Sequence, residues 1–304
     1  MKPRLKPGVA VIALGNWGTS LTAALANADL LHEIVVRRRK ASSPPAAVSW
    51  KHAALDAHIL WLCVPDSAIS DVAAEIVYRR PDLRGQIIVH SSGALTVDAL
   101  DAARRAPDRR HSPAVASVHP VMTFPTRHAI PLSGVLFGIE SPNPAPRRTL
   151  HSLIRKLGGH PFDIASKDKA LYHAAGTLAS PLLVSELTAA IVTARLAGLD
   201  RKTAVRWVEA LATATSRNLF ACGPSNSFSG PFARGDASTI RLHLQALQKH
   251  PIVADVYRSL ALHALATLPV RSAQALIAAL RSSSAQKPHE PPGKTPRRAS
   301  RMRN

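Results

Sequence analysis

The sequence predicts an α/β fold with a doubly wound parallel sheet, followed by an all-α domain. Three observations lead to this prediction. A strand, a glycine turn, a helix and a second strand follow one another near the N-terminus. Short apolar runs and helical patterns then alternate up to about residue 140, and the signals from 167 to about 281 are nearly all helical. The expected domains are residues 1–165 and 166–281, with a tail at 282–304.

The N-terminal pattern is the layout of a dinucleotide-binding unit of the Rossmann type. An apolar run at 9–12 ends in a glycine turn, and a helical pattern and a second apolar run at 34–36 follow. Gly15 would let the backbone approach a pyrophosphate, and Gly18 would let the helix pack against the strand. The helix N-terminus would offer N–H groups and a positive dipole end to the phosphates. Ala13 occupies the first glycine position and departs from the fingerprint.

The residues after the second strand bear on which nicotinamide cofactor is bound. An NAD-binding unit usually carries Asp or Glu about 20 residues beyond the glycines, where it bonds the ribose 2′-hydroxyl. Here that register holds Arg37 and Arg38, and no acid lies between Arg37 and Lys51. Guanidinium groups form charge-assisted, often bidentate bonds to phosphate oxygens. The sequence therefore predicts NADP as the cofactor; the alternative is a solvated basic run that closes an exposed strand.

Further apolar runs end in turns that should meet at one edge of the sheet. Runs at 58–64, 86–90 and 116–118 precede these turns, and ligands of open α/β sheets bind outside the carboxyl ends of the strands. The predicted cofactor-binding residues are Gly15, Asn16, Trp17, Gly18, Arg37, Arg38, Val64, Pro65, Asp66, Ser91, Ser92 and Gly93. His119 follows the last of these runs and is a fourth candidate at this edge, or a buried core histidine. Residues 134–139 and 161–164 are expected to form further strands around a helix at 147–157.

Two further segments contain candidate catalytic residues. Lys169 and His173 are four residues apart and share one helical face, where they could polarise a carbonyl or imine and move a proton. The alternative is a solvated Lys beside a His satisfied at a domain interface. In the Gly/Pro-rich stretch at 229–236, Arg234 is placed to clamp a carboxylate or phosphate of an anionic substrate. The alternative there is a pair of Arg234 with Asp236 that ties two helices together.

The composition argues against several other classes of protein. The two cysteines, Cys63 and Cys222, cannot form a disulfide framework, and no histidine pair has metal-site spacing, so no metal is expected. No apolar run reaches the 18 or so residues that span a bilayer, because Pro181, Glu186 and Arg195 interrupt the longest candidate. These features predict a cytoplasmic protein that does not bind a membrane.

The net charge of +20 is partly local, because residues 281–304 hold seven Lys or Arg against one Glu. A tail rich in Ser, Pro and Arg with few apolar residues is expected to be disordered. Such a tail can bind nucleic acid non-specifically through its phosphates. No basic stripe interleaved with aromatic residues indicates specific nucleic-acid binding.

Taken together, the motifs resemble those of a known group of bacterial proteins. In chain order they are the glycine turn, Val64-Pro65-Asp66, His90-Ser91-Ser92-Gly93, His119-Pro120-Val121-Met122-Thr123-Phe124, Tyr172-His173-Ala174-Ala175 and Gly230-Pro231-Phe232-Ala233-Arg234-Gly235-Asp236. Over roughly residues 8–265 the chain resembles bacterial Rossmann-like proteins with a C-terminal helical domain of unknown function. That group is similar to pyrroline-5-carboxylate reductases, deazaflavin-dependent NADP oxidoreductases and the 6-phosphogluconate dehydrogenase superfamily.

The resemblance implies an NADP-dependent oxidoreductase that transfers a hydride to or from a small C=O or C=N substrate in an interdomain cleft. In the 6-phosphogluconate dehydrogenase superfamily, a Lys and a residue four positions later on the first helix of the second domain often serve catalysis. Lys169 and His173 match those positions, although Asn is commoner at the second. Pro181 stands where the family tends to show Asn after Ala-Ser. That departure, together with Ala13, leaves open an alternative function, a non-catalytic NADP-binding sensor or scaffold.

The helical region is also expected to mediate assembly. It is rich in Ala and Leu, and this much apolar surface can exceed what a domain of about 115 residues hides in one core. Large exposed apolar patches usually mark interfaces, and closed two-fold dimers are the commonest soluble assemblies. The sequence therefore predicts a homodimer through the C-terminal helices, with each cleft completed at or near the interface. The alternative is a monomer with a self-contained helical bundle.

Overall fold

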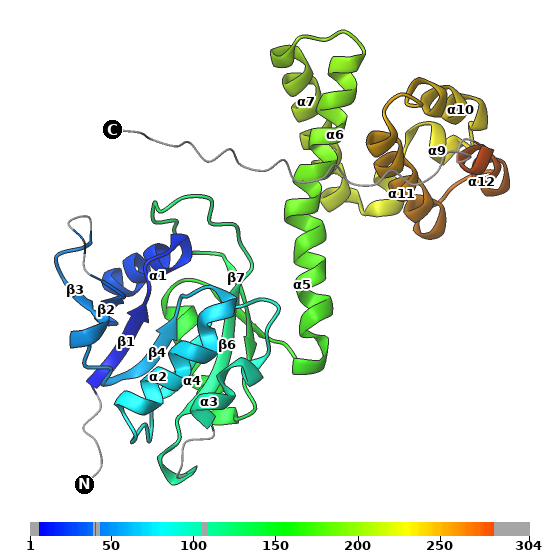
Figure 1. The fold of residues 1–304 in the computed structure, drawn as a ribbon. Helices are drawn as coiled ribbons and strands as arrows, with labels where there is room; N and C mark the ends of the chain where they lie inside the picture. Colours follow the sequence, from blue (N-terminus) through cyan, green and yellow to red (C-terminus); the bar gives the residue numbers. More distant parts are fainter. Residues whose placement is uncertain (1–5, 39, 41–42, 105–108, 283–304) are drawn as a thin grey trace, which may run out of the picture. The chain divides into compact units, whose positions relative to one another are not determined.

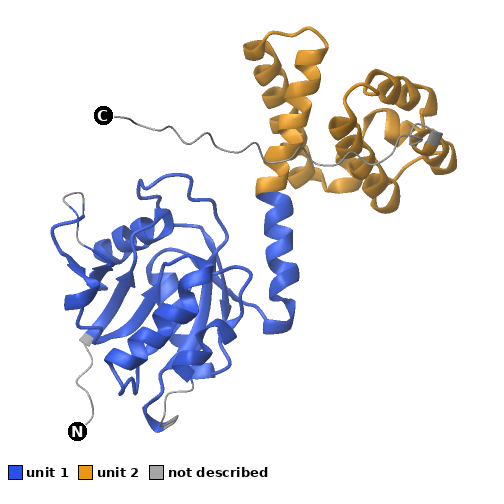
Figure 2. Cartoon of the chain, viewed as in Figure 1, with its two compact units in different colours: residues 1–180 blue, residues 181–304 orange. Residues whose placement is uncertain are grey.

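The computed structural model describes residues 6–38, 40, 43–104 and 109–282, so that nearly all of the predicted tail lies outside the described residues. The chain divides into two compact units, residues 1–180 and 181–304 (Figure 2). The sequence places its domain boundary at 165, because the helical signals begin there. The helix at Lys169–Thr177 belongs to the first unit. Its first residue is hydrogen-bonded to two strands of the sheet.

Unit 1 is built on an eight-stranded sheet with the order β3-β2-β1-β4-β5-β6-β7-β8 (Figure 1). The strands are β1 (Lys6–Ile12), β2 (Leu31–Val36), β3 (Ala47–Ser49), β4 (Ala57–Leu62), β5 (Ile87–His90), β6 (Ala114–Pro120), β7 (Leu136–Glu140) and β8 (His160–Asp163). All neighbours are parallel except β6 and β7, which are antiparallel. The chain order reverses between β1 and β4, which makes this a doubly wound sheet with a topological switch point there. The predicted fold class is confirmed.

Helices cover both faces of this sheet. They are α1 (Asn16–Asn27), α2 (Ile69–Arg79), α3 (Asp101–Arg104) and α4 (Pro144–Lys156), and α5 (Lys169–Thr177) follows β8. Val9 and Val11 of β1 lie in a core cluster with side chains of α1 and α4, whereas Ala10 and Ile12 lie in a second cluster with side chains of α2. Because both faces are buried, the strands are continuous apolar runs instead of alternating patterns.

Unit 2 is helical. It contains α6 (Leu183–Leu196), α7 (Arg201–Cys222), α8 (Pro224–Ser227), α9 (Gly230–Arg234), α10 (Ala237–Ala246), α11 (Pro251–Thr267) and α12 (Ala273–Ser282). A π-helical turn at Leu178–Leu182 that contains Pro181 joins α5 to α6. Proline has no N–H to donate, and such local widening of a helix accommodates it. A small core includes Ile240, Leu244 and Leu276 from α10 and α12.

Among the described residues, one helical segment, Ser166–Leu196, is long and apolar enough to cross a membrane. Its best 18-residue window has a mean hydropathy of 1.5, and none of that window is buried. Pro181, Glu186 and Arg195 were expected to interrupt this run, but the helical segment continues through all three. Leu171, Leu178 and Val184 of this segment are exposed.

Candidate functional site

The predicted turns lie at one edge of the sheet. β1, β2, β4, β5 and β6 are successively parallel, so their carboxyl ends share that edge. The glycine turn follows β1, Arg37 follows β2, and the turns at 64–66 and 91–93 follow β4 and β5. His119 lies at the same end of β6. The sequence pattern therefore identified this edge correctly.

The backbone of the glycine turn is open to a ligand. α1 begins at Asn16 with Gly15 as its N-cap, and no side chain caps the helix. A Cβ on Gly15 would meet nothing within 4 Å, so the space beside it is free for the close approach of a phosphate. A Cβ on Gly18 would lie 2.2 Å from the carbonyl oxygen of Ala13, which shows how closely the helix packs on the turn. The N–H groups of the first helical turn and this open backbone fit a dinucleotide pyrophosphate.

Ala13 keeps the conformation that glycine usually supplies. Its φ is +80°, in the region that L-residues other than Asn and Asp rarely adopt. The turn therefore keeps its geometry although alanine replaces the first glycine of the fingerprint.

The side chains of Asn16 and Trp17 contact other segments of unit 1. Asn16 Nδ2 donates to the carbonyl oxygen of Phe124 at 2.7 Å, and the Trp17 ring lies against the Phe124 ring with centroids 5.1 Å apart. Trp17 Nε1 donates to Ser91 Oγ at 2.7 Å, and Trp61 Nε1 donates to the same oxygen at 2.7 Å. Ser91 thereby ties the turn after β1 to the turn after β5.

Arg37 and Arg38 are exposed at the end of β2, beside the glycine turn of the neighbouring strand. No acid follows β2 in the described part of this segment, which runs to Lys40 with a gap at 39 and resumes at Ser43. This is the position at which a ribose 2′-substituent is met in dinucleotide-binding sheets. Two guanidinium groups there fit a 2′-phosphate better than a 2′-hydroxyl.

The turns after β4 and β5 are bonded to each other. Ser92 Oγ donates to Asp66 Oδ2 at 2.8 Å and accepts from the backbone N–H of Leu95 at 2.9 Å. His90 Nδ1 accepts from the N–H of Ser92 at 3.1 Å, so Nε2 carries the proton and donates to the carbonyl oxygen of Thr96. Burial lowers the pKa of His90 to about 4, which keeps the ring neutral. His90 is therefore a structural histidine that shapes this turn. In the neighbouring turn, Val64 packs on the core and Pro65 is exposed.

Lys169 and His173 share a helical face, as predicted, but the two side chains have different surroundings. Lys169 is 1% exposed; its Nζ lies 2.9 Å from Glu140 Oε2 and also donates to the buried Ser117 hydroxyl. Glu140, 2% exposed, also accepts from the N–H of Val97 and from the hydroxyl of Ser166. Burial lowers the pKa of Lys169, and the bond to Glu140 opposes that shift. Lys169 thus anchors the start of α5 to β6 and β7.

His173 lies in a second cluster with His119 and Tyr172. His119 Nδ1 is 2.7 Å from Tyr172 Oη, and the His119 and His173 rings meet edge to face with centroids 5.9 Å apart. All three side chains are half-buried. Sequence reasoning missed Tyr172 and Glu140 as site residues. The signal for Tyr172 was its place next to His173, and the signal for Glu140 was an acid at the end of an apolar strand.

Arg234 belongs to unit 2 and is exposed. Asp236 is the N-cap of α10: its carboxylate accepts from the N–H and hydroxyl of Thr239 and from the Ser238 hydroxyl. These bonds hold the pKa of Asp236 far below its usual range. Gly235, with φ of +76°, ends α9, and a Cβ there would lie 2.5 Å from the Arg271 carbonyl oxygen. The Gly-Asp part of this motif is thus a turn between two helices.

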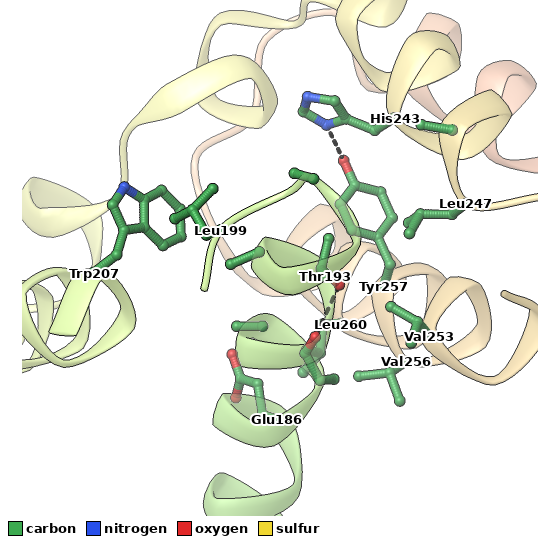
Figure 3. A pocket seen from close by; sticks show the side chains of 15 residues that line it. Glu186, Thr193, Leu199, Trp207, His243, Leu247, Val253, Val256, Tyr257 and Leu260 are labelled. Atoms are coloured by element: carbon green, nitrogen blue, oxygen red, sulfur yellow. Dashed lines mark hydrogen bonds between the residues drawn. The ribbon is translucent and has the colours of Figure 1, made fainter. Parts of the chain in front are cut away.

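Unit 2 also contains an apolar groove of about 640 Å³ (Figure 3). Side chains of α6, α7, α10 and α11 line it, and its polar groups include Glu186 and a hydrogen bond of 2.9 Å between His243 Nδ1 and Tyr257 Oη. None of the predicted site residues is among the described residues that line the groove.

Comparison with family models identifies both parts of the chain. Residues 1–107 match the model of a Rossmann-like domain, and residues 135–264 match a domain of unknown function, DUF2520. The chain combines a Rossmann-like domain with a DUF2520 domain. The resemblance inferred from the motifs is confirmed. A search of curated proteins finds no match.

Solved structures of similar fold include several reductases. A Bacteroides fragilis protein provisionally named an NADP oxidoreductase is 19% identical, with a TM-score of 0.64 over 84% of this chain and 96% of its own. An imine reductase from a Pseudomonas species is 18% identical, with a TM-score of 0.57 over 90% and 99%. Plasmodium falciparum pyrroline carboxylate reductase, solved with NADP bound, is 14% identical, with a TM-score of 0.55 over 94% and 99%. At these identities the likeness shows the fold.

Proposed function

We propose that this protein is an NADP-dependent oxidoreductase that transfers a hydride to or from a small C=O or C=N substrate. The observation that carries the proposal is the open backbone at Gly15 beside Arg37 and Arg38, with no acid in the ribose register. The names of the structural neighbours, which include imine and pyrroline carboxylate reductases, support the reaction class. The bound nicotinamide supplies the hydride. Residues of the chain bind the nicotinamide cofactor and transfer the proton.

Each part of the edge has a separate binding role in this proposal. Gly15, Gly18 and the first N–H groups of α1 hold the pyrophosphate, and Arg37 and Arg38 hold the 2′-phosphate. The turns at 64–66 and 91–93 line the site, and the hydrogen bond between Ser92 and Asp66 joins them. Arg234 remains a candidate clamp for an anionic substrate group because its guanidinium is exposed.

Replacing Arg37 with Glu should weaken NADPH binding about ten- to a hundred-fold and leave NADH binding nearly unchanged. A charge-assisted Arg–phosphate contact contributes about 1.5–3 kcal/mol. Fluorescence titration of both cofactors measures the effect. The matched control is Arg148→Glu, the same charge reversal at an exposed position of α4. Equal affinity of the unaltered protein for NADPH and NADH would show that Arg37 has no part in cofactor choice.

Replacing Gly15 with Ala should impair cofactor binding without destabilising the fold. Gly15 has φ of −76°, which alanine adopts freely, and its Cβ would meet no protein atom. The expected change in the free energy of unfolding is within about 0.5 kcal/mol. The added methyl group occupies the space through which the pyrophosphate approaches, so we expect NADPH affinity to fall at least about ten-fold. Unchanged affinity in titration would place the phosphates elsewhere.

One observation favours a second candidate function, a protein that binds NADP without turnover. Lys169, in the register of the superfamily's catalytic lysine, is buried in an ion pair. In that case NADPH raises the melting temperature, as mass action requires, while no keto acid, imine or deazaflavin oxidises it. Steady NADPH consumption with any such compound rules out this second candidate.

We also expect the protein to form a homodimer through its C-terminal helices. Apolar side chains on α5, α6 and α7 are exposed, up to 87% for Phe220. Uncovered apolar surface of this extent is typical of interfaces. Light scattering at micromolar concentrations should give about twice the chain mass of 32.5 kDa. A mass of one chain across the whole range contradicts the expectation.

A further inference from the structure

We propose that Tyr172 and His119 form a proton-transfer pair at the carboxyl edge of the sheet, and that Tyr172 Oη is the atom that exchanges a proton with the substrate. The inference rests on the oxidoreductase function proposed above, because a hydride transferred to C=O or C=N leaves the oxygen or nitrogen in need of a proton. It gives the acid–base role to Tyr172 and a positioning role to Lys169.

Tyr172 and His119 are close enough to exchange a proton. His119 lies at the end of β6, and Tyr172 reaches it from α5 with 2.7 Å between His119 Nδ1 and Tyr172 Oη. The two rings are nearly perpendicular, at 89° with centroids 5.6 Å apart. A distance of 2.7 Å is within the range for proton transfer between a phenol and an imidazole. Both side chains are half-buried, whereas the Lys169 side chain is fully enclosed.

Two glycines, Gly93 and Gly138, leave room for the rings of this cluster. A Cβ on Gly93 would lie 2.4 Å from His173 Cδ2 and 2.8 Å from His119 Nε2. A Cβ on Gly138 would lie 2.9 Å from Tyr172 Oη. Real Cβ atoms do not approach other atoms so closely, so any larger residue at either position would displace the rings. The rings of Tyr172, His119 and His173 therefore fit a space that glycine alone leaves open.

Burial sets the protonation state of both members of the pair. Burial lowers the pKa of His119 to about 4, reinforced by His173 and Lys169 and opposed by Asp66. Burial raises the pKa of Tyr172 to about 12. Both groups are thus neutral near pH 7, and each stays neutral when it gains one proton as it gives up another.

A neutral pair of this kind conducts one proton without a change of charge. In the starting state His119 carries its proton on Nδ1 and donates it to Tyr172 Oη, which leaves the phenol proton directed away from the imidazole. The O–H bond of Tyr172 breaks toward the substrate heteroatom, the Nδ1 proton moves to Tyr172 Oη, and a proton from water binds His119 Nε2. One proton enters and one leaves, and rotation of the phenol O–H with return of the imidazole tautomer resets the pair.

The buried Lys169–Glu140 pair positions this arrangement. Lys169 is the first residue of α5, three positions before Tyr172, and its ammonium is bonded to Glu140 on β7 and Ser117 on β6. These bonds fix the start of α5 on the strand that carries His119. Lys169 therefore acts on the reaction through the placement of Tyr172 and His173.

The first test needs neither cofactor nor substrate. Nitrogen-15 NMR of the full chain labelled at histidine, with His119 assigned through a His119→Asn variant, should show a neutral ring at pH 7 with the proton on Nδ1. Tyr172→Phe should shift that proton toward a mixture of tautomers. A charged His119 at pH 7, a proton fixed on Nε2, or a spectrum unaffected by Tyr172→Phe overturns the proposal.

The second test measures turnover with NADPH and a panel of cyclic imines and α-keto acids. General acid–base catalysis contributes about 10²–10⁴-fold, so Tyr172→Phe should lower kcat by that factor while the Kd for NADPH stays within about two-fold. Tyr78→Phe, the same change at an exposed position of α2, is the control and should leave kcat unaltered. A wild-type kcat in Tyr172→Phe overturns the proposal. If NADPH binds and no compound is reduced, the proposed reductase activity fails, and the nitrogen spectra decide whether the pair exists.

Discussion

Replacing Glu140 with Gln should lower the free energy of unfolding of unit 1 by about 3–5 kcal/mol, which is the usual cost of breaking a buried ion pair on one side. The change leaves the Lys169 ammonium, 1% exposed, without its carboxylate, while the amide oxygen of the new side chain can still accept the bonds from Val97 and Ser166. The loss therefore comes from the uncompensated charge. Urea unfolding followed by tryptophan fluorescence measures it, since Trp17, Trp50 and Trp61 lie in unit 1 and Trp207 in unit 2.

The double variant Lys169→Met/Glu140→Gln should recover most of that loss. Burial lowers the pKa of Lys169, and the double variant removes both the buried ammonium and the carboxylate that faces it. Buried ion pairs can be replaced by uncharged side chains of similar volume with little loss of stability. The coupling energy from the double-mutant cycle should therefore be large, and additive losses would refute the interpretation. Asp98→Asn, which breaks an exposed pair with Arg104, is the control and should cost less than about 1 kcal/mol.

The sequence predicted the edge of the sheet well because the signals for it are local. Apolar runs, the glycine turn and the residues that follow each strand are all read within a few positions of one another. Parallel strands then bring the separate turns to one edge, which follows from topology without any knowledge of side-chain packing. Gly15 and Arg37 lie where that reasoning placed them.

The roles of individual side chains were harder to predict because they depend on distant partners. Lys169 was predicted as catalytic from its spacing to His173, but its environment is set by Glu140, 29 positions earlier, and by Ser117, 52 positions earlier. Asn16 was predicted to bind the cofactor, yet its amide bonds to the carbonyl oxygen of Phe124, 108 positions away. Periodicity places a residue on a face of an element. It does not say which strand or loop covers that face.

Replacing Gly93 with Ala should separate the rings of His173 and His119 and weaken the bond between His119 and Tyr172. The φ of Gly93 is not positive, so alanine can adopt the same backbone conformation. The expected effect of the substitution is therefore steric. The new Cβ would lie 2.4 Å from His173 Cδ2 and 2.8 Å from His119 Nε2, so the two rings have to move. Overpacking of this kind costs about 1–3 kcal/mol.

Two measurements separate this steric effect from a general loss of stability. The nitrogen-15 spectrum of His119 in Gly93→Ala should approach that of Tyr172→Phe, because both changes remove the same hydrogen bond. Gly176→Ala, where a Cβ on α5 meets nothing within 4 Å, should instead stabilise the protein by about 0.5–1 kcal/mol through helix propensity alone. A Gly93→Ala protein with an unaltered His119 spectrum would mean that the rings shift without breaking the pair. The glycine would then be needed only for packing, and not to align His119 with Tyr172.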